Sequence, residues 1–445
     1  MKSIATLSLA IAAVSLTQPA YAQEAKATQE QLSQPVVIQY SRPNDQRGIN
    51  VFETPKVAGA TYDGFKIQWG AAFTQQFQSL AHSNTADSVP TAGPTNLVNK
   101  NRLKSIGSGF NNAVANLYLN AQLAKGIRVQ LTSYLSSRHH NETWVKDGFV
   151  QIDESPIDVP FLNDLMKYTT LKVGHFQVNY GDMQFRRTDN GQAIYNPFVG
   201  NAIMDAFTTE IGAEAIFQRH GLLGVVAMSN GESRGRVDMP KERSHTLMAK
   251  AGFDKQLNSD LRVRLTGSYR AQPTAVSNIL YAGDRAGSRY YMVLENSAAT
   301  ESAQPYSGNI NPGFSYRSTS FVVNPFIKFR GLEFFGMAET ATGRSAAETS
   351  ERTVKQYMAE GLYRFAANDK FYVGARWNSV QGDLGAAAGS DVTVDRVNVG
   401  GGWFVTPTLM AKVELVKQSY SGFLRTDIRN GAKFAGLMME GVVAF

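Results

Sequence analysis

Apolar and polar residues alternate over many short stretches of this chain, with the period of two that gives a β-strand two different faces. The alternation is clearest in residues 65–77, 112–123, 261–270 and 409–418. In the first of these, the apolar positions are Phe65, Ile67, Trp69, Ala71, Phe73 and Phe77. The chain is also rich in residues that suit strands and turns, with 25 Phe, 18 Tyr and 39 Gly. The pattern predicts an all-β protein.

The connectors between the predicted strands fall into two classes that alternate strictly. Short connectors are predicted at residues 125–126, 155–167, 220–221, 254–260, 330–331, 368–369 and 406–407, with a short helix in 155–167. Long polar connectors are predicted at residues 80–110, 137–143, 179–206, 230–242, 271–315, 341–352, 381–391 and 419–431. Seven short hairpins and the two end strands predict a transmembrane antiparallel β-barrel of about 16 strands with long extracellular loops.

Both ends of the chain agree with export to an outer membrane. Lys2, the apolar run 4–16 and the small residues Ala20 and Ala22 predict a secretory signal peptide over residues 1–22. Residues 23–62 are polar and are expected to form a periplasmic extension, with the barrel over 63–445. The chain stops inside an amphipathic strand at Phe445. This ending resembles that of bacterial outer-membrane barrels, whose last strand closes the barrel and is recognised by the barrel-assembly machinery.

Composition excludes several other classes. After the signal peptide no apolar run approaches the ~18 residues of a membrane-spanning helix. With no cysteine, the chain depends on strand pairing and burial rather than on disulfides. A net charge of +7 suits anionic solutes or lipopolysaccharide and is too small to indicate nucleic-acid binding. The adjacent His139 and His140 would point to opposite faces of a strand, so they predict no metal site. Enzyme and cofactor motifs are also missing, which predicts a non-enzymatic protein without cofactors.

The stretch LKVGHFQVNYGDM, residues 171–183, resembles the strand that begins the signature region of the phosphate-selective porin O and P superfamily. The resemblance implies a Gram-negative outer-membrane channel, a homotrimer as the common assembly, and a following loop that bends into the channel. By strand count this loop is the third long one. Its sequence, FRRTDNGQAIYNPFVGNAIMDAF, departs from the family pattern, so phosphate specificity is not carried over.

Two groups of charged residues are candidates for the channel lining. Arg186, Arg187, Asp189 and Asn190 lie in the third long loop and are expected at the channel constriction, where basic side chains attract anions. The alternatives are a brace that holds the loop to the wall and an ordinary surface loop. The second group, a basic ladder on one lumen face, is Arg262, Arg264 and Arg270. Its alternative role is to stabilise the wall by pairing with acidic residues on neighbouring strands.

Three classes of function remain open from the sequence. The first is a porin that forms a water-filled channel for passive diffusion of small hydrophilic, anionic solutes. The second is a substrate-specific channel, and the third is a structural or adhesive barrel that acts through its long loops. The expected partners are outer-membrane lipid and lipopolysaccharide, the barrel-assembly machinery and the permeating solutes.

Overall fold

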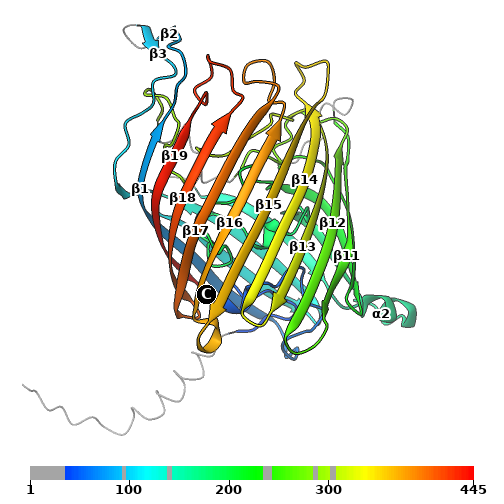
Figure 1. The fold of residues 1–445 in the computed structure, drawn as a ribbon. Coiled ribbons are helices and arrows are strands. Elements are labelled where there is room, and N and C mark those ends of the chain that lie inside the picture. Colours follow the sequence, from blue (N-terminus) through cyan, green and yellow to red (C-terminus); the bar gives the residue numbers. More distant parts are fainter. Residues whose placement is uncertain (1–35, 93–96, 138–142, 234–242, 284–288, 301–306) are drawn as a thin grey trace, which may run out of the picture. The chain divides into compact units, whose positions relative to one another are not determined.

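The structure is a computed structural model that describes residues 36–92, 97–137, 143–233, 243–283, 289–300 and 307–445. Residues 38–445 form one compact unit. Within the described residues, sixteen strands build a barrel (Figure 1). They are β1 (Lys66–Ser83), β5 (Val114–Ala124), β6 (Ile127–Ser136), β7 (Trp144–Ile152), β8 (Thr169–Gln177), β9 (Thr209–Arg219), β10 (Leu222–Ser229), β11 (Thr246–Gln256), β12 (Leu261–Gln272), β13 (Arg317–Phe329), β14 (Leu332–Arg344), β15 (Arg352–Phe365), β16 (Phe371–Gly382), β17 (Val392–Thr406), β18 (Leu409–Ser421) and β19 (Lys433–Ala444).

Each barrel strand pairs antiparallel with its neighbour in sequence, and β1 also pairs antiparallel with β19, which closes the ring. After the last strand, the backbone of Phe445 exchanges two hydrogen bonds with Ala71, at 2.9 and 3.0 Å. A short strand, β4 (Gly109–Phe110), pairs with β1, and β2 (Pro90–Ala92) pairs with β3 (Leu97–Asn99) in the loop before it. The all-β class and the closed sixteen-stranded antiparallel barrel predicted from the sequence are therefore confirmed.

Short and long connectors lie at opposite ends of the barrel, as predicted (Figure 1). The turn between β9 and β10 shows the local cause: His220 and Gly221 both have positive φ, 52° and 85°. Two such residues form the turn type whose twist matches a tight hairpin. The longest connector at the short-turn end contains the helix α2 (Pro160–Met166). The described residues also form the 3-10 helices η1 (Gln46–Gly48), η2 (Met183–Phe185) and η3 (Ala367–Asp369). No helix in the described part of the chain is long and apolar enough to cross a membrane.

The two faces of the wall differ as the alternation predicted. Large apolar side chains stay exposed on the outside, among them Trp69, Val226, Leu415 and Met439. The intervening residues are buried inside and are mostly polar or charged, among them Thr74, Gln76, Arg264 and Glu414. A surface of this kind is stable where lipid covers the outside of a barrel.

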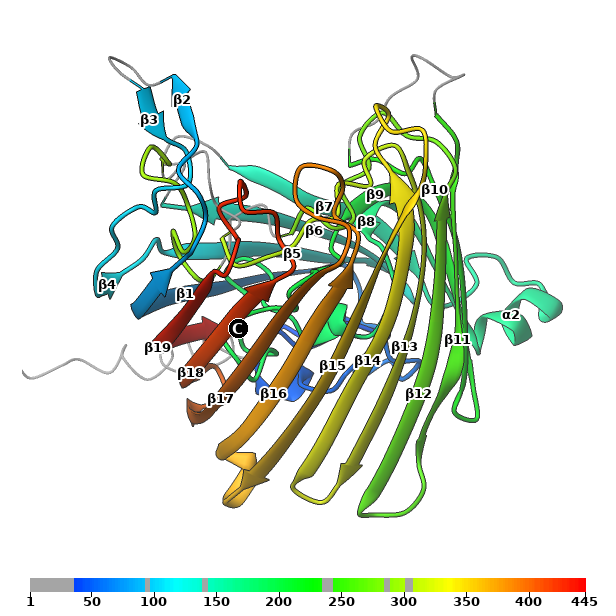
Figure 2. The same cartoon turned by 45° about the horizontal axis from the view of Figure 1, so that its top comes forward.

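Described residues of three segments lie inside the ring of strands (Figure 2). They are residues 38–58, the β8–β9 loop (178–208) and the β12–β13 loop (273–316). The two loops meet: Phe207 donates its N–H to Leu280 O at 2.8 Å and Ile310 donates to Ile203 O at 2.8 Å. Much of the interior is therefore filled by the chain itself.

Residues 38–58, named here the N-terminal collar, follow the inside of the barrel at the end with the short turns. Collar residues bond to wall or turn residues around this rim: Gln39 to Gln122, Gln46 to Pro407 and Asn368, Asn50 to Glu333, and Lys56 to Asp153 and Thr169. The collar then returns to its start, where Tyr40 N–H donates to Ala58 O at 3.1 Å. The sequence predicts a periplasmic extension over residues 23–62, and its part from residue 38 onward belongs to the same compact unit as the barrel strands. The expected signal peptide and residues 23–35 lie outside the described residues.

Candidate functional site

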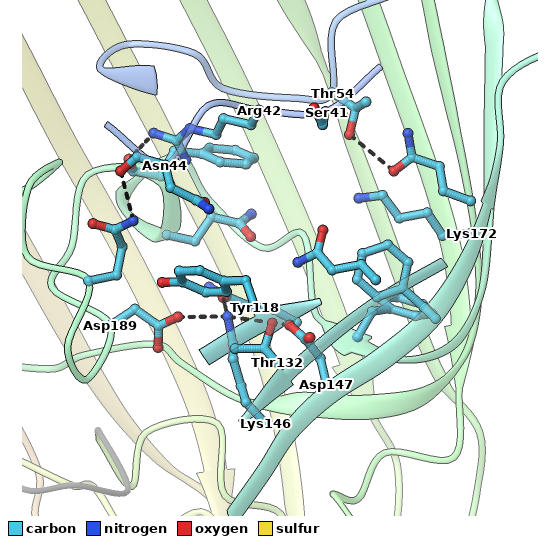
Figure 3. Close-up of a pocket in the computed structure, with 18 of the residues that line it drawn as sticks. Ser41, Arg42, Asn44, Thr54, Tyr118, Thr132, Lys146, Asp147, Lys172 and Asp189 are labelled. Atoms are coloured by element: carbon cyan, nitrogen blue, oxygen red, sulfur yellow. Dashed lines mark hydrogen bonds and ion pairs between the residues drawn. The ribbon is translucent and has the colours of Figure 1, made fainter. Parts of the chain in front are cut away.

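A polar cavity of about 190 Å³ lies inside the barrel, between the collar, the β8–β9 loop and the wall strands β5 to β8 (Figure 3). The collar contributes Ser41, Arg42, Asn44 and Thr54, and the wall contributes Tyr118, Thr132, Lys146, Asp147 and Lys172. Because this cavity combines charged groups with a place inside the barrel, it is the candidate site for contact with a permeating solute.

The β8–β9 loop leaves the wall at Gly181, which has a φ of +68° that glycine adopts without strain. Two wall side chains hold this bend: Gly181 N–H donates to Ser268 Oγ at 3.1 Å and Asp182 N–H to Asn324 Oδ1 at 2.9 Å. The carboxylate of Asp182 then pairs with Arg264 at 2.8 Å and Lys250 at 2.7 Å. These contacts turn the chain from the strand into the lumen, as the family resemblance implied for this loop.

Arg186 lies in a buried network and does not line the cavity. Its guanidinium pairs with Glu360 at 2.6 Å, lies 3.7 Å from Glu333 and bonds to Asn50 of the collar. Its charge is thus matched by two wall carboxylates. This is the geometry of a brace that joins the loop, the collar and the wall.

Arg187 and Asp189 do line the cavity. Arg187 makes a two-pronged pair with Asp205, at 3.0 and 2.6 Å, while Asp189 accepts from Lys146 at 2.6 Å and from the Tyr134 hydroxyl. Burial opposes ionisation of Asp189, but the charges of Lys146 and Arg187 outweigh it and lower the pKa of this carboxyl. Asp189 is therefore a carboxylate at neutral pH.

Asn190 binds the wall instead of the cavity. Its side-chain amide donates to Ala115 O at 2.7 Å and to Asn116 Oδ1 at 2.9 Å. The next residue, Gly191, lies so close to the wall that a Cβ would be 2.6 Å from Ala115 Cα. The loop is thus pressed against the inside of β1 and β5 at this point.

The predicted basic ladder is paired with carboxylates along its length. Arg262 pairs with Asp254 at 2.6 Å, Arg264 with Asp182 and with Glu53 of the collar at 2.8 Å each, and Arg270 with Glu210 at 2.5 Å. These three arginines do face the lumen side of β12, but their partners come from the wall, the loop and the collar together. None of the three lines the described cavity.

Several lining residues were not identified from the sequence. Lys146 and Asp147 are consecutive in β7, yet both are buried inside, because a register shift between Thr132 and Ser133 of β6 interrupts the alternation opposite them. Arg128 of β6 occupies a regular inward position and is only 4% exposed. Such positions were detectable from the alternation, whereas Arg42 comes from the collar, whose sequence has no periodic signal. His139 and His140 lie outside the described residues.

Taken together, the lining carries five cations and three carboxylates. The cations are Arg42, Arg128, Lys146, Lys172 and Arg187, and the carboxylates are Glu53, Asp147 and Asp189. The cavity therefore has a formal excess of two positive charges. Inside a narrow channel, an excess of positive charge attracts anions and repels cations.

No family model matches the chain, and no curated protein matches it in sequence. Solved structures do match in fold. An anion-selective porin from Comamonas acidovorans is 9% identical with a TM-score of 0.51, and the alignment covers 86% of this chain and 100% of that one. The trimer form of OmpT, an outer membrane protein of Vibrio cholerae, and a mutant of OmpT without loop L8 each give 9% identity, a TM-score of 0.50 and the same coverage. The chain thus has the fold of these proteins, and a closed, even-stranded barrel with an apolar outer face is a barrel of the Gram-negative outer membrane.

Proposed function

We propose that this protein is a porin-like, non-enzymatic channel that lets small hydrophilic solutes diffuse passively across the outer membrane, with a preference for anions. The observation that carries the proposal is the polar cavity inside the closed barrel, with its excess of two positive charges. Barrels of about 16 strands are wide enough to keep an aqueous path, whereas barrels of about 8 strands are filled by side chains.

Planar-bilayer recording of the purified, refolded protein tests this function. We expect discrete conductance steps and, in a salt gradient, a reversal potential on the anion-selective side. The bias should decrease as salt is raised, because charges are screened over about 8–10 Å at physiological ionic strength. Folded protein that inserts without conducting would instead support the adhesive or structural barrel.

A substrate-specific channel is the second candidate, and the filling of the lumen favours it. The collar and two loops occupy space that a wide diffusion pore would leave open. Such a channel should show small conductance steps and a current that saturates with its solute. The resemblance of residues 171–183 to the phosphate-selective porins makes phosphate a solute to compare with chloride.

Of the four loop residues expected at the constriction, we assign the contact with permeating ions to Arg187 and Asp189 and a bracing role to Arg186 and Asn190. The trimer form of OmpT supports a homotrimer for this protein as well. Chemical cross-linking followed by denaturing electrophoresis measures that assembly directly. Lipopolysaccharide on the outer face and the barrel-assembly machinery at the C-terminal strand remain the other proposed partners.

A further inference from the structure

We propose that Arg42 of the collar and Arg128 of the wall form a binding site for a small organic monocarboxylate in the lumen. The proposal rests on the channel function above and names a ligand class and two residues for it. Both arginines line the same cavity, and they come from segments that are 86 positions apart in the sequence. The collar therefore completes the site rather than only narrowing the barrel.

The other three cations of the cavity already have carboxylate partners. Lys146 pairs with Asp189 at 2.6 Å, Lys172 with Glu214 at 3.1 Å and Arg187 with Asp205 at 2.6 Å. Of the three lining carboxylates, Asp189 and Asp147 both pair with Lys146, at 2.6 and 3.5 Å, and Glu53 pairs with Lys250 and Arg264, which lie outside the cavity lining. Arg42 and Arg128 are thus the two lining cations that form no ion pair with a carboxylate of the described residues.

Arg128 is a buried cation whose hydrogen-bond acceptors among the described residues are neutral, and the nearby carboxylate of Asp153 reaches it only through Gln151. It donates to Gln151 Oε1 at 2.7 Å and to Gln130 Oε1 at 3.1 Å, and its Nε has no hydrogen-bond partner among the described residues. Burying a guanidinium against amides alone is unfavourable compared with burying it beside an anion. A bound carboxylate would supply the direct ionic partner that Asp153 and Asp147 do not provide.

Arg42 of the collar likewise donates its hydrogen bonds to neutral acceptors. It donates to Gly48 O at 2.8 Å and to Phe185 O at 3.0 Å, and its guanidinium lies 3.7 Å from the centre of the Tyr195 ring. No carboxylate of the described residues forms an ion pair with it. The carbonyl bonds and the ring hold the charge in place, so the site is formed before a ligand arrives.

The rest of the lining favours a carboxylate on a small organic body. Guanidinium groups bind carboxylates through paired N–H donors. The neighbouring surface combines amides, such as Asn120 and Gln177, with the aromatic rings of Phe149, Phe176 and Tyr118. The faces of aromatic rings suit a flat organic group, whereas a multiply charged phosphate placed against them would lose part of its hydration shell. We therefore assign the site to a monocarboxylate, with benzoate as the probe.

Calorimetric titration of benzoate into the refolded protein in detergent tests the site without requiring conductance. We expect saturable binding by the unaltered protein and a loss of about tenfold in affinity for Arg42→Gln or Arg128→Gln, the change that removal of one charged hydrogen bond produces. The double variant should not bind. Arg425→Gln removes the same charge from an exposed loop arginine that pairs with Asp87, and it should bind as the unaltered protein does.

The outcomes separate the site from the channel function. Absence of benzoate binding by a conducting protein, or equal binding by the folded double variant, would overturn the site and leave the channel standing. Binding without conductance would support the site and refute the channel. Tighter binding of inorganic phosphate than of benzoate would overturn the ligand class. If Arg128→Gln does not refold, Arg128→Lys keeps the charge and is expected to fold and to bind more weakly than the unaltered protein.

Discussion

Two adjacent arginines in the β8–β9 loop have different surroundings, and this difference is the reason for the different roles that we propose for them. Arg186 is 2% exposed and shares Glu360 with Arg376, while Arg187 reaches the cavity with its charge matched by Asp205. The two side chains thus have different partners although they are adjacent in the sequence. Residue type alone therefore does not identify which arginine meets the solute.

Replacement of Arg186 by alanine is expected to destabilise the folded barrel. It leaves Glu360 and Glu333 with one guanidinium partner each, Arg376 and Arg364, and removes a bond to the collar. Breaking a buried pair of this kind costs about 3 kcal/mol or more. The free energy of unfolding in urea measures the loss, and Arg47→Ala, an exposed arginine paired with Asp45, should cost less than about 1 kcal/mol. Equal stability of both variants would contradict the bracing role.

Replacement of Asp189 by asparagine is expected to strengthen the preference for anions. The change keeps the shape of the side chain and removes one of the three lining carboxylates, so that Lys146 loses its closest counter-charge. The reversal potential in a salt gradient should move further to the anion-selective side. Asp87→Asn, which removes a carboxylate from an exposed loop, is the matched control and should leave the reversal potential unchanged. An unchanged reversal potential would refute a role for Asp189 in selectivity.

At the scale of elements, the strands were predictable and the segments inside the barrel were not. Alternation in residues 261–270 and 409–418 is a local signal, because each strand needs only lipid on one side and polar groups on the other. The collar has no such signal: Asn50 bonds to Glu333, 283 positions away. Its position depends on pairs with wall side chains that are brought together only when the barrel closes. For the same reason, the sequence did not identify Arg42 as a residue of the site or Glu53 as a partner of the basic ladder.

Deletion of the collar, residues 38–58, is expected to enlarge the channel. The collar lines the rim at the short-turn end and supplies six of the residues around the cavity: Ser41, Arg42, Asn44, Phe52, Glu53 and Thr54. The barrel strands pair with one another without it, so closure should persist. Single-channel conductance should rise severalfold in the deletion variant. An unchanged conductance would mean that the narrowest point of the channel lies elsewhere.

The attachment of the collar to the β8–β9 loop should resist acid. Glu53 and Asp182 each form ion pairs with Lys250 and Arg264. Burial opposes ionisation of both carboxyls, but the charges of the two cations outweigh this effect and lower the pKa of each carboxyl. A carboxyl whose pKa is lower in the folded protein stabilises the fold at pH values above its unfolded pKa of about 4. This contribution is lost only as the pH falls through the lower pKa of the folded state. Conductance should therefore stay constant from about pH 7 to about pH 4 and rise only in stronger acid. A rise already near pH 6 would show that another group controls the collar.

At the scale of the whole molecule, closure of the ring is what every other feature depends on. The lumen segments, the cavity and the paired charges exist only if β19 meets β1 over residues 72–83. A closed barrel leaves no unpaired strand edge in lipid, which makes it resistant to unfolding. The purified protein should accordingly resist SDS at room temperature and change its electrophoretic mobility after boiling.

A substitution at Phe445 can distinguish closure of the barrel from recognition of the last strand by the assembly machinery. Its backbone completes the pairing with Ala71, while its side chain is 59% exposed on the outer face. Phe445→Ala keeps the backbone bonds and should refold in detergent to the heat-modifiable form, yet reach the outer membrane in reduced amount, since the aromatic side chain is what the assembly machinery is expected to recognise. Phe365→Ala, which removes another outward aromatic side chain at a strand end, should reach the membrane normally. Equal membrane levels of both variants would remove the recognition role from Phe445. Failure of Phe445→Ala to refold in detergent would show that its side chain is needed for closure itself.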